Sequence, residues 1–103
     1  MNHQDEYRVI AEFSMHPLGE GTSLSRYVRS ALDELRKAKS VRLSVNPMGT
    51  VIEAKSLQEI FAAVQAAHER VFKEGASRVA FTLAVDDRRD KRRRMEDKVS
   101  AVS

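Results

Sequence analysis

Hydrophobic and polar residues alternate along the segment that starts at Tyr7. The apolar positions are Val9, Ala11, Phe13 and Met15, and the residues between them point to the other side. Alternation with a period of two is typical of a strand that is buried on one face. We therefore predict a first strand that runs from Tyr7 to the break beginning at Pro17.

Two later segments change to the period of a helix. The apolar positions are Leu24, Val28, Ala31, Leu32 and Leu35 in the first, and Leu57, Ile60, Phe61, Val64, Ala67, Val71 and Phe72 in the second. This spacing places one apolar stripe on each helix. Ser23 is the predicted N-cap of the first helix. Ser56 and Glu59 have the spacing of a capping box at the start of the second, and Gly75 is its predicted C′ residue.

The remaining elements are a hairpin, a fourth strand and a terminal helix. Residues 41–46 alternate, Pro47-Met48-Gly49 turns the chain, and residues 50–54 form the second arm of the hairpin. Residues 79–85 alternate again as a strand. Met95, Val99 and Val102 recur at helical spacing in an otherwise charged segment.

The order of these elements predicts one α+β domain over residues 1–103. It is β-α-β-β-α-β with an added C-terminal helix, which is the ferredoxin-like sandwich. Right-handed crossovers place both long helices on one face of a four-stranded antiparallel sheet.

The other face of this sheet has an unusual composition. It carries small and apolar residues, namely Ile10, Ser14, Ser44, Ala80, Thr82 and Ala84. Small side chains allow another sheet to approach closely, so we expect a second subunit to cover this face. Met95 and Val99 of the terminal helix are expected to seal the same contact.

Composition narrows the class of protein. The chain has no cysteine, which excludes disulfides and thiolate chemistry. No apolar stretch approaches the roughly 18 residues of a membrane span, and the N-terminal residues are too polar for a signal peptide, so we expect a cytoplasmic protein without a membrane partner.

Positive charge is concentrated near the C-terminus. The formal net charge is +3, and much of the excess lies in Arg88 to Arg94. We interpret this run as a solvated face or a subunit contact. The predicted central strands offer no aromatic platform on which RNA bases could stack, so no nucleic-acid partner is expected.

Candidate catalytic residues are few. No two of the three histidines have metal-ligand spacing, so no metal site is predicted. His68 lies beside the apolar helix stripe and is expected to pack there. For His16, which precedes the turn at Pro17, two alternatives stay open: its side chain faces a pocket, or it has no role in one. Glu12 and Glu53 either border one end of the sheet as an acid-base pair or each satisfy a neighbouring arginine or backbone amide.

Several motifs occur in an order that resembles a known family. They are Pro17, Gly19, Ser23, Ser25, Tyr27 and Val28; Pro47-Met48-Gly49-Thr50, Ile52 and Glu53; His68-Glu69, Gly75 and Arg78-Val79; and Asp86-Asp87-Arg88, Asp90-Lys91 and Lys98-Val99. From Val9 to Val102 the chain resembles the thiamine-binding protein family.

The resemblance implies a ferredoxin-like protein that is not an enzyme and needs no cofactor. It implies binding of thiamine or its hydroxymethylpyrimidine part, and a homodimer that assembles into a homotetramer through the sheet faces and the C-terminal helix. It also implies a ligand pocket near Ser23, Ser25, Thr50 and Glu53. There a carboxylate can accept from the exocyclic amine of the ligand, and hydroxyls can satisfy its ring nitrogens.

Two other functional classes stay open. One is a small enzyme with a site formed between subunits by Glu12, His16 and Glu53. The other is a structural or regulatory oligomer that senses a metabolite.

Overall fold

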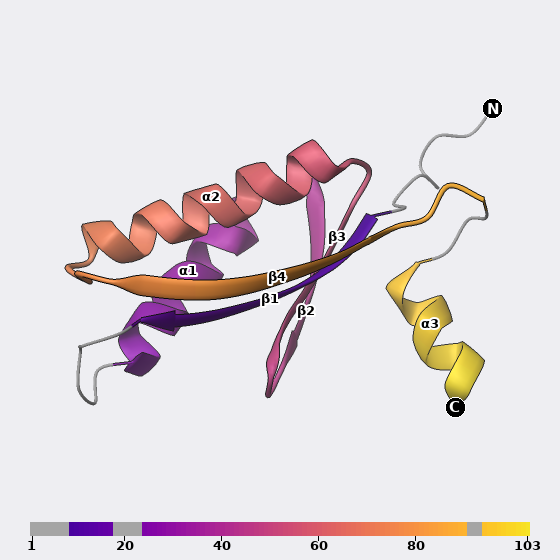
Figure 1. Cartoon of the computed structure of the whole chain (residues 1–103), viewed down its shortest axis with the longest axis horizontal. Coiled ribbons are helices and arrows are strands. Elements are labelled where there is room, and N and C mark those ends of the chain that lie inside the picture. The colour runs from indigo at the N-terminus through magenta and orange to yellow at the C-terminus, as the bar shows by residue number, and fades with distance from the viewer. Residues whose placement is uncertain (1–8, 18–23, 91–93) are drawn as a thin grey trace.

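In a computed structural model the chain is described over residues 9–17, 24–90 and 94–103. The elements are β1 (Val9–Pro17), α1 (Leu24–Lys37), β2 (Val41–Asn46), β3 (Gly49–Ala54), α2 (Leu57–Lys73), β4 (Val79–Asp87) and α3 (Met95–Val102). The strands form one antiparallel sheet in the order β2-β3-β1-β4 (Figure 1). The predicted ferredoxin-like α+β fold is thereby confirmed.

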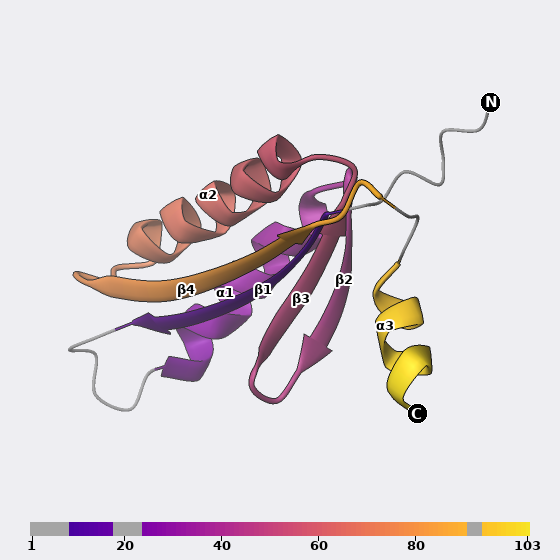
Figure 2. The ribbon, with the colours of Figure 1, turned by 45° about the vertical axis from the view of Figure 1, so that its right-hand side comes forward.

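The sheet has two different faces. Figure 2 shows α1 and α2 on one side of it and α3 on the other. Because side chains alternate along a strand, Ala11 and Phe13 of β1 are buried beneath α1 and α2, while Glu12 points to the opposite side and is exposed. We call the side beneath α1 and α2 the helix face and the other side the open face.

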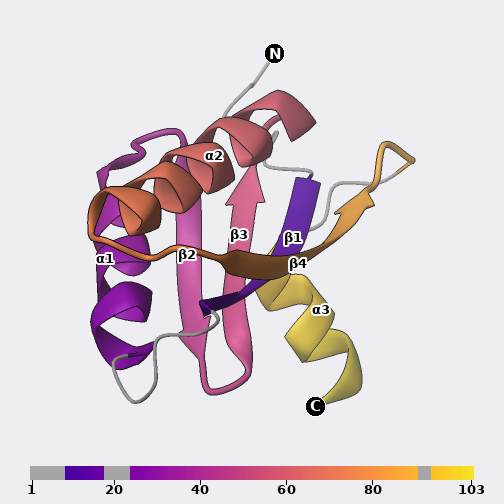
Figure 3. The same cartoon turned by 60° about the vertical axis from the view of Figure 1, so that its left-hand side comes forward.

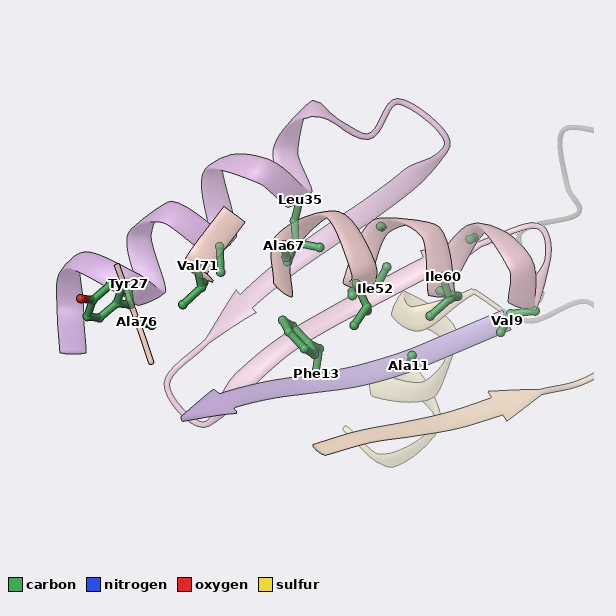
Figure 4. Close-up of a cluster of buried hydrophobic side chains, with 14 residues drawn as sticks. Val9, Ala11, Phe13, Tyr27, Leu35, Ile52, Ile60, Ala67, Val71 and Ala76 are labelled. Carbon is green, nitrogen blue, oxygen red and sulfur yellow. The ribbon is translucent and has the colours of Figure 1, made fainter. Parts of the chain in front are cut away.

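The core on the helix face joins both long helices to the sheet. Val9, Leu35, Ile52, Ile60 and Val71 are fully buried and come from β1, α1, β3 and α2 (Figure 4). Burying one such side chain stabilises the fold by about 1.5–3 kcal/mol. This packing fixes α1 above the hairpin formed by β2 and β3, and so fixes the walls of the cavity described below.

The ends of α2 agree with the sequence prediction. The Ser56 hydroxyl accepts a hydrogen bond from the backbone N–H of Glu59 at 3.2 Å, as an N-cap does. Gly75 follows the C-cap residue and has φ +113°, a conformation that glycine adopts without steric cost. Both predicted caps are confirmed, whereas the predicted N-cap Ser23 lies outside the described residues.

The hairpin between β2 and β3 determines which residues of the two strands lie opposite each other. Its loop is Pro47-Met48, so Asn46 pairs with Gly49 and, further along, Arg42 pairs with Glu53. Thr50 and Glu53 are three positions apart on one strand, which is an odd number of steps. They therefore lie on opposite faces of the sheet, Thr50 on the helix face and Glu53 on the open face.

The open face is partly covered by α3. Met95 and Val99 of α3 border a cavity of about 500 Å³ together with Ile10 and Ser44 of the sheet. On β4 the small side chains of the open face, Ala80, Thr82 and Ala84, are exposed in the single chain. Coverage of this part by a second subunit stays a prediction.

Candidate functional site

A cavity of about 420 Å³ lies between α1 and the tip of the β2–β3 hairpin. We call it the α1–hairpin cavity. Its apolar lining consists of Phe13, Met15, Val28, Ala31, Leu32, Leu35, Val45, Pro47 and Met48, and its polar lining includes Ser14, His16, Asn46 and Thr50. Small-molecule sites commonly measure about 300–1,000 Å³ and combine apolar walls with a few polar groups. The cavity thus has the size and composition of a site for a small molecule.

The hydroxyl of Thr50 is the most informative polar group in this cavity. Thr50 lies on β3 between Phe13 of β1 and Val45 of β2, and its exposed fraction is 6%. Within residues 9–17, 24–90 and 94–103, this hydroxyl has no hydrogen-bond partner. Buried polar groups normally have one, so the hydroxyl is available to a ligand or a water molecule.

Other polar groups lie around the same cavity. The His16 ring lies with its Nε2 atom 3.1 Å from the Ser14 hydroxyl, and the Asn46 side-chain amide donates to the Ser44 carbonyl at 3.2 Å. His16, whose position the sequence left open, therefore borders a cavity. Met48 at the hairpin tip is 83% exposed, and its unbranched thioether side chain can adapt to what enters.

The four residues predicted to bind the ligand do not converge within one chain. Thr50 lines the α1–hairpin cavity, and Glu53 lies on the other face of the sheet. Ser25 is exposed in the first turn of α1 and is not part of the cavity lining, while Ser23 lies outside the described residues. Their joint role in one site stays a prediction.

Glu53 instead holds α3 on the open face. Its side chain is fully buried and accepts a charge-assisted hydrogen bond from Arg42, its partner across the hairpin. The other carboxylate oxygen accepts the backbone N–H of Met95 at 2.8 Å. Met95 is the first residue of α3, so a carboxylate occupies the positive end of this helix.

Two further ion pairs attach α3 to the sheet. The Arg42 guanidinium also binds Glu96 at 2.5 Å, and Lys98 binds Asp86 of β4 at 2.7 Å. No residue of α3 is fully buried. Its attachment therefore rests mainly on polar contacts, with Glu53 as the buried centre.

Acid is expected to weaken the attachment of α3. The hydrogen bond from Arg42 lowers the pKa of Glu96 below its ordinary value, so the carboxylate stabilises the folded state above that value and loses its contribution as pH falls through the lowered pKa. Urea midpoints measured from pH 7 down to below 4.5 should fall, and Glu96→Gln should make the fall shallower. Identical pH profiles for Glu96→Gln and wild type would contradict this role of Glu96.

Glu34 contributes to the same acid dependence from another place. Its carboxylate on α1 binds Arg70 of α2 at 3.1 Å, and this contact lowers the pKa of Glu34. Because this pair does not involve α3, Glu34→Gln serves as the control that separates the loss of α3 from a general loss of stability.

The remaining candidate chemistry is weaker. Glu12 is exposed on the open face, beside a shallow hollow of about 220 Å³. His68 packs against Phe72 and Phe81 with ring-centroid distances of 5.0 and 5.8 Å, in agreement with the packing role expected for it. In the described part of the chain, no group of three or more histidine, cysteine or acidic side chains is placed to hold a metal ion.

The first arginines of the basic run are paired locally. Arg88 binds Asp90 at 2.8 Å and Arg89 binds Asp87 at 2.9 Å, and these contacts raise the pKa of both arginines. The next three residues of the run, Lys91, Arg92 and Arg93, lie outside the described residues. None of the helices in the described ranges has the length and hydropathy required to cross a bilayer.

Comparison with known proteins places the chain among small proteins of similar length. The sequence model of a family described as "Thiamine-binding protein" matches residues 11–103. A UPF0045 protein of Methanothermobacter thermautotrophicus is 47% identical over 95 residues, which cover 91% of this chain and 95% of the relative. A UPF0045 protein of Bacillus subtilis is 37% identical over 98 residues, covering 91% and 93%.

Solved structures show the same fold. A hypothetical protein of Methanocaldococcus jannaschii superposes with a TM-score of 0.82 at 39% identity, covering 91% of this chain and 94% of that one. A protein of Thermotoga maritima with a provisional role in thiamine biosynthesis or salvage superposes with a TM-score of 0.74 at 21% identity, covering 92% and 98%. At that identity the second likeness shows the fold alone.

Proposed function

The chain belongs to the thiamine-binding protein family, and on this premise we propose that it binds thiamine or the hydroxymethylpyrimidine part of thiamine without converting it. Family membership over nearly the whole chain is the observation that carries the proposal. Such a protein would serve as a cytoplasmic store, buffer or carrier of the vitamin.

The α1–hairpin cavity is the proposed site. An aminopyrimidine ring is flat, carries an amine donor and has ring nitrogens that accept hydrogen bonds. The apolar walls of the cavity suit its faces, and the unpartnered Thr50 hydroxyl can donate to a ring nitrogen. Ser23 precedes α1 in the sequence and Ser25 lies in its first turn, and both are proposed as further hydroxyl contacts of the ligand.

Glu53 enters this proposal in a different way. Within one chain it lies across the sheet from Thr50, and both its oxygens already accept hydrogen bonds. A ligand in the α1–hairpin cavity can therefore contact Glu53 only if that residue comes from a second chain. We accordingly propose that Thr50, not Glu53, is the main polar contact supplied by the chain that forms the cavity.

Self-association through the open face is also part of the proposal. The small exposed side chains Ala80 and Thr82 on β4 and the exposed Val99 on α3 support a homodimer and homotetramer built by stacked sheets and α3. Native mass spectrometry of the purified protein reads the subunit count directly and also detects any ligand that is retained.

The direct test is a calorimetric titration with thiamine and with hydroxymethylpyrimidine. Thr50→Val keeps the shape and removes the hydroxyl, so affinity should fall by about 0.5–1.5 kcal/mol, the value of one neutral hydrogen bond. Ser40→Ala is the control because it removes an exposed hydroxyl that does not line the cavity. It should bind like the wild type.

Three outcomes would count against this function. No measurable binding of either compound by the wild type would reject the ligand, and equal effects of Thr50→Val and Ser40→Ala would reject the cavity. Turnover of a bound compound would reject a binding role and favour an enzyme.

A further inference from the structure

The strand β1 extends beyond the strand that pairs with it on the hairpin side. It lies between β4 and β3 in the sheet (Figure 3). Its pairing with β4 runs along the whole strand, whereas its pairing with β3 ends at Phe13, which lies opposite Thr50. Residues 14–17 of β1 therefore have a neighbouring strand on one side only.

The direction of the backbone groups in this stretch follows from Phe13. A Cβ atom added to Gly49 of β3 would lie 3.1 Å from the Phe13 carbonyl oxygen, so this oxygen points towards β3. In an antiparallel ladder the N–H and C=O of one residue point to the same side, and the side alternates from residue to residue. The N–H and C=O of Met15 therefore point in the same direction as those of Phe13, away from β4.

Pro17 gives independent support for this direction. It lies opposite Val79 of β4 and two residues after Met15, so its backbone points to the same side as that of Met15. Proline has no N–H, and if this side faced β4 the missing donor would interrupt the ladder. The proline therefore fits a strand in which Met15 and Pro17 both point away from β4.

The backbone of Met15 borders the α1–hairpin cavity. Met15 and Gly49 both line this cavity, and the hairpin turns back at Gly49, so no strand lies opposite Met15 on this side. Within the described ranges, the main-chain N–H and C=O of Met15 have no hydrogen-bond partner there. Backbone groups in a folded protein are normally paired, so these two are available to a molecule that enters the cavity.

The lining of the cavity favours recognition by neutral groups. Among its described residues there is no aspartate, glutamate, lysine or arginine. A charged group that entered would lose its hydration without an opposite charge to compensate for the loss. The part of a ligand that fits is therefore an uncharged ring with hydrogen-bonding atoms at its edge, and the main chain of Met15 offers that edge one donor and one acceptor.

We propose that Met15 binds the edge of the aminopyrimidine ring through its main chain, in the place that a longer β3 would occupy. The exocyclic amine donates to the Met15 carbonyl, and the ring nitrogen beside the amine accepts from the Met15 N–H. The Thr50 hydroxyl then donates to the other ring nitrogen. This contact rests on the proposed function, and it assigns the selection of the aminopyrimidine to the backbone of β1.

Amide hydrogen exchange tests the contact in the unaltered chain. Without ligand, the Met15 N–H should exchange faster than the N–H groups of Phe13 and Ser14, which lie in the ladders with β3 and β4. Hydroxymethylpyrimidine at ten times its dissociation constant should slow exchange at Met15 roughly tenfold. Exchange at Met15 that is the same with and without bound ligand would overturn the contact, and slow exchange there in the free protein would overturn the open edge.

A proline at this position removes the N–H without removing a ladder hydrogen bond. Met15→Pro should bind hydroxymethylpyrimidine roughly 2- to 12-fold more weakly than Met15→Ala, which loses the same thioether but keeps the N–H. Ser14→Pro removes an N–H that faces β4, so it should unfold at a lower urea concentration than Met15→Pro. Equal affinities of the two folded Met15 variants would overturn the contact.

A ligand analogue separates this contact from the proposed function. In the analogue the ring nitrogen beside the amine is replaced by C–H, so the ring cannot accept from Met15. Calorimetry should show that the wild type binds it roughly 2- to 12-fold more weakly than hydroxymethylpyrimidine, and that this difference disappears in Met15→Pro. A difference that persists in a folded Met15→Pro protein would overturn the contact and leave the function standing. No binding of hydroxymethylpyrimidine by the wild type would reject both, and the exchange measurement decides the contact if Met15→Pro does not fold.

Discussion

Replacing Glu53 with alanine is expected to lower the free energy of unfolding by about 1.5–3 kcal/mol, the value of a hydrogen bond to a charged group. The loss is costly because the Glu53 carboxylate is fully buried and accepts from two donors, although the Arg42 guanidinium keeps part of its surface in water. Here the Arg42 guanidinium would lose its buried acceptor, and the backbone N–H of Met95 would lose its hydrogen bond at the start of α3. Urea denaturation followed by circular dichroism measures the loss.

Two variants make this expectation specific. Glu53→Gln keeps an oxygen for the Met95 N–H and should lose less stability than Glu53→Ala. Glu12→Ala removes an exposed carboxylate from the same face and should change stability by no more than about 0.5 kcal/mol. A Glu53→Ala protein as stable as the wild type would show that the carboxylate does not hold α3.

The same glutamine variant also separates two roles of Glu53. If the ligand occupies the α1–hairpin cavity of one chain, a folded Glu53→Gln protein should bind thiamine as the wild type does. A charge-assisted contact to the aminopyrimidine would instead make the affinity fall by about 1.5–3 kcal/mol. That result would bring a second chain into the site.

Filling the α1–hairpin cavity is expected to weaken ligand binding by about a hundredfold. Val28 borders the cavity and is 40% exposed, so Val28→Trp can place an indole ring in the cavity without removing a core side chain. If the ring displaces about 100 Å² of apolar contact with the ligand, binding weakens by about 2.5 kcal/mol, close to a hundredfold in the dissociation constant. Calorimetric titration with thiamine measures this dissociation constant.

The control for this variant is Arg29→Trp. Arg29 is the next residue on α1, is exposed and does not line the cavity, so a tryptophan there tests only the effect of a bulky surface substitution. Undiminished thiamine binding by a folded Val28→Trp protein would place the ligand elsewhere.

The spacing of apolar residues was sufficient to predict the fold because strands and helices have different periods, and each segment of this chain follows one of them. The alternation of β1 and the capping pair Ser56 and Glu59 are local signals that tertiary contacts did not change. The hairpin loop Pro47-Met48 also determines that Arg42 lies opposite Glu53, and the same period of two separates Thr50 from Glu53. The alternation along this strand therefore already indicated that Thr50 and Glu53 of one chain cannot line the same site.

The way in which α3 is attached was not predictable in the same way. The small residues of the open face predict that Met95 and Val99 lie over it, but helical spacing does not say what holds a short, charged helix there. Its docking depends on a backbone N–H that meets a carboxylate 42 residues earlier in the chain. No side-chain pattern encodes such a contact, and the cavity near Thr50 likewise depends on how α1 crosses the hairpin.

The way in which α3 is held also means that the core and the C-terminal helix resist opening through different kinds of contact. The core between α1, α2 and the sheet resists unfolding through buried apolar surface, which changes little with salt. The C-terminal helix is held by Glu53, Arg42, Lys98 and their partners, contacts that ions and protons weaken. Opening of this helix is therefore a local equilibrium, distinct from global unfolding, whose position follows the ionic conditions in the surrounding solution.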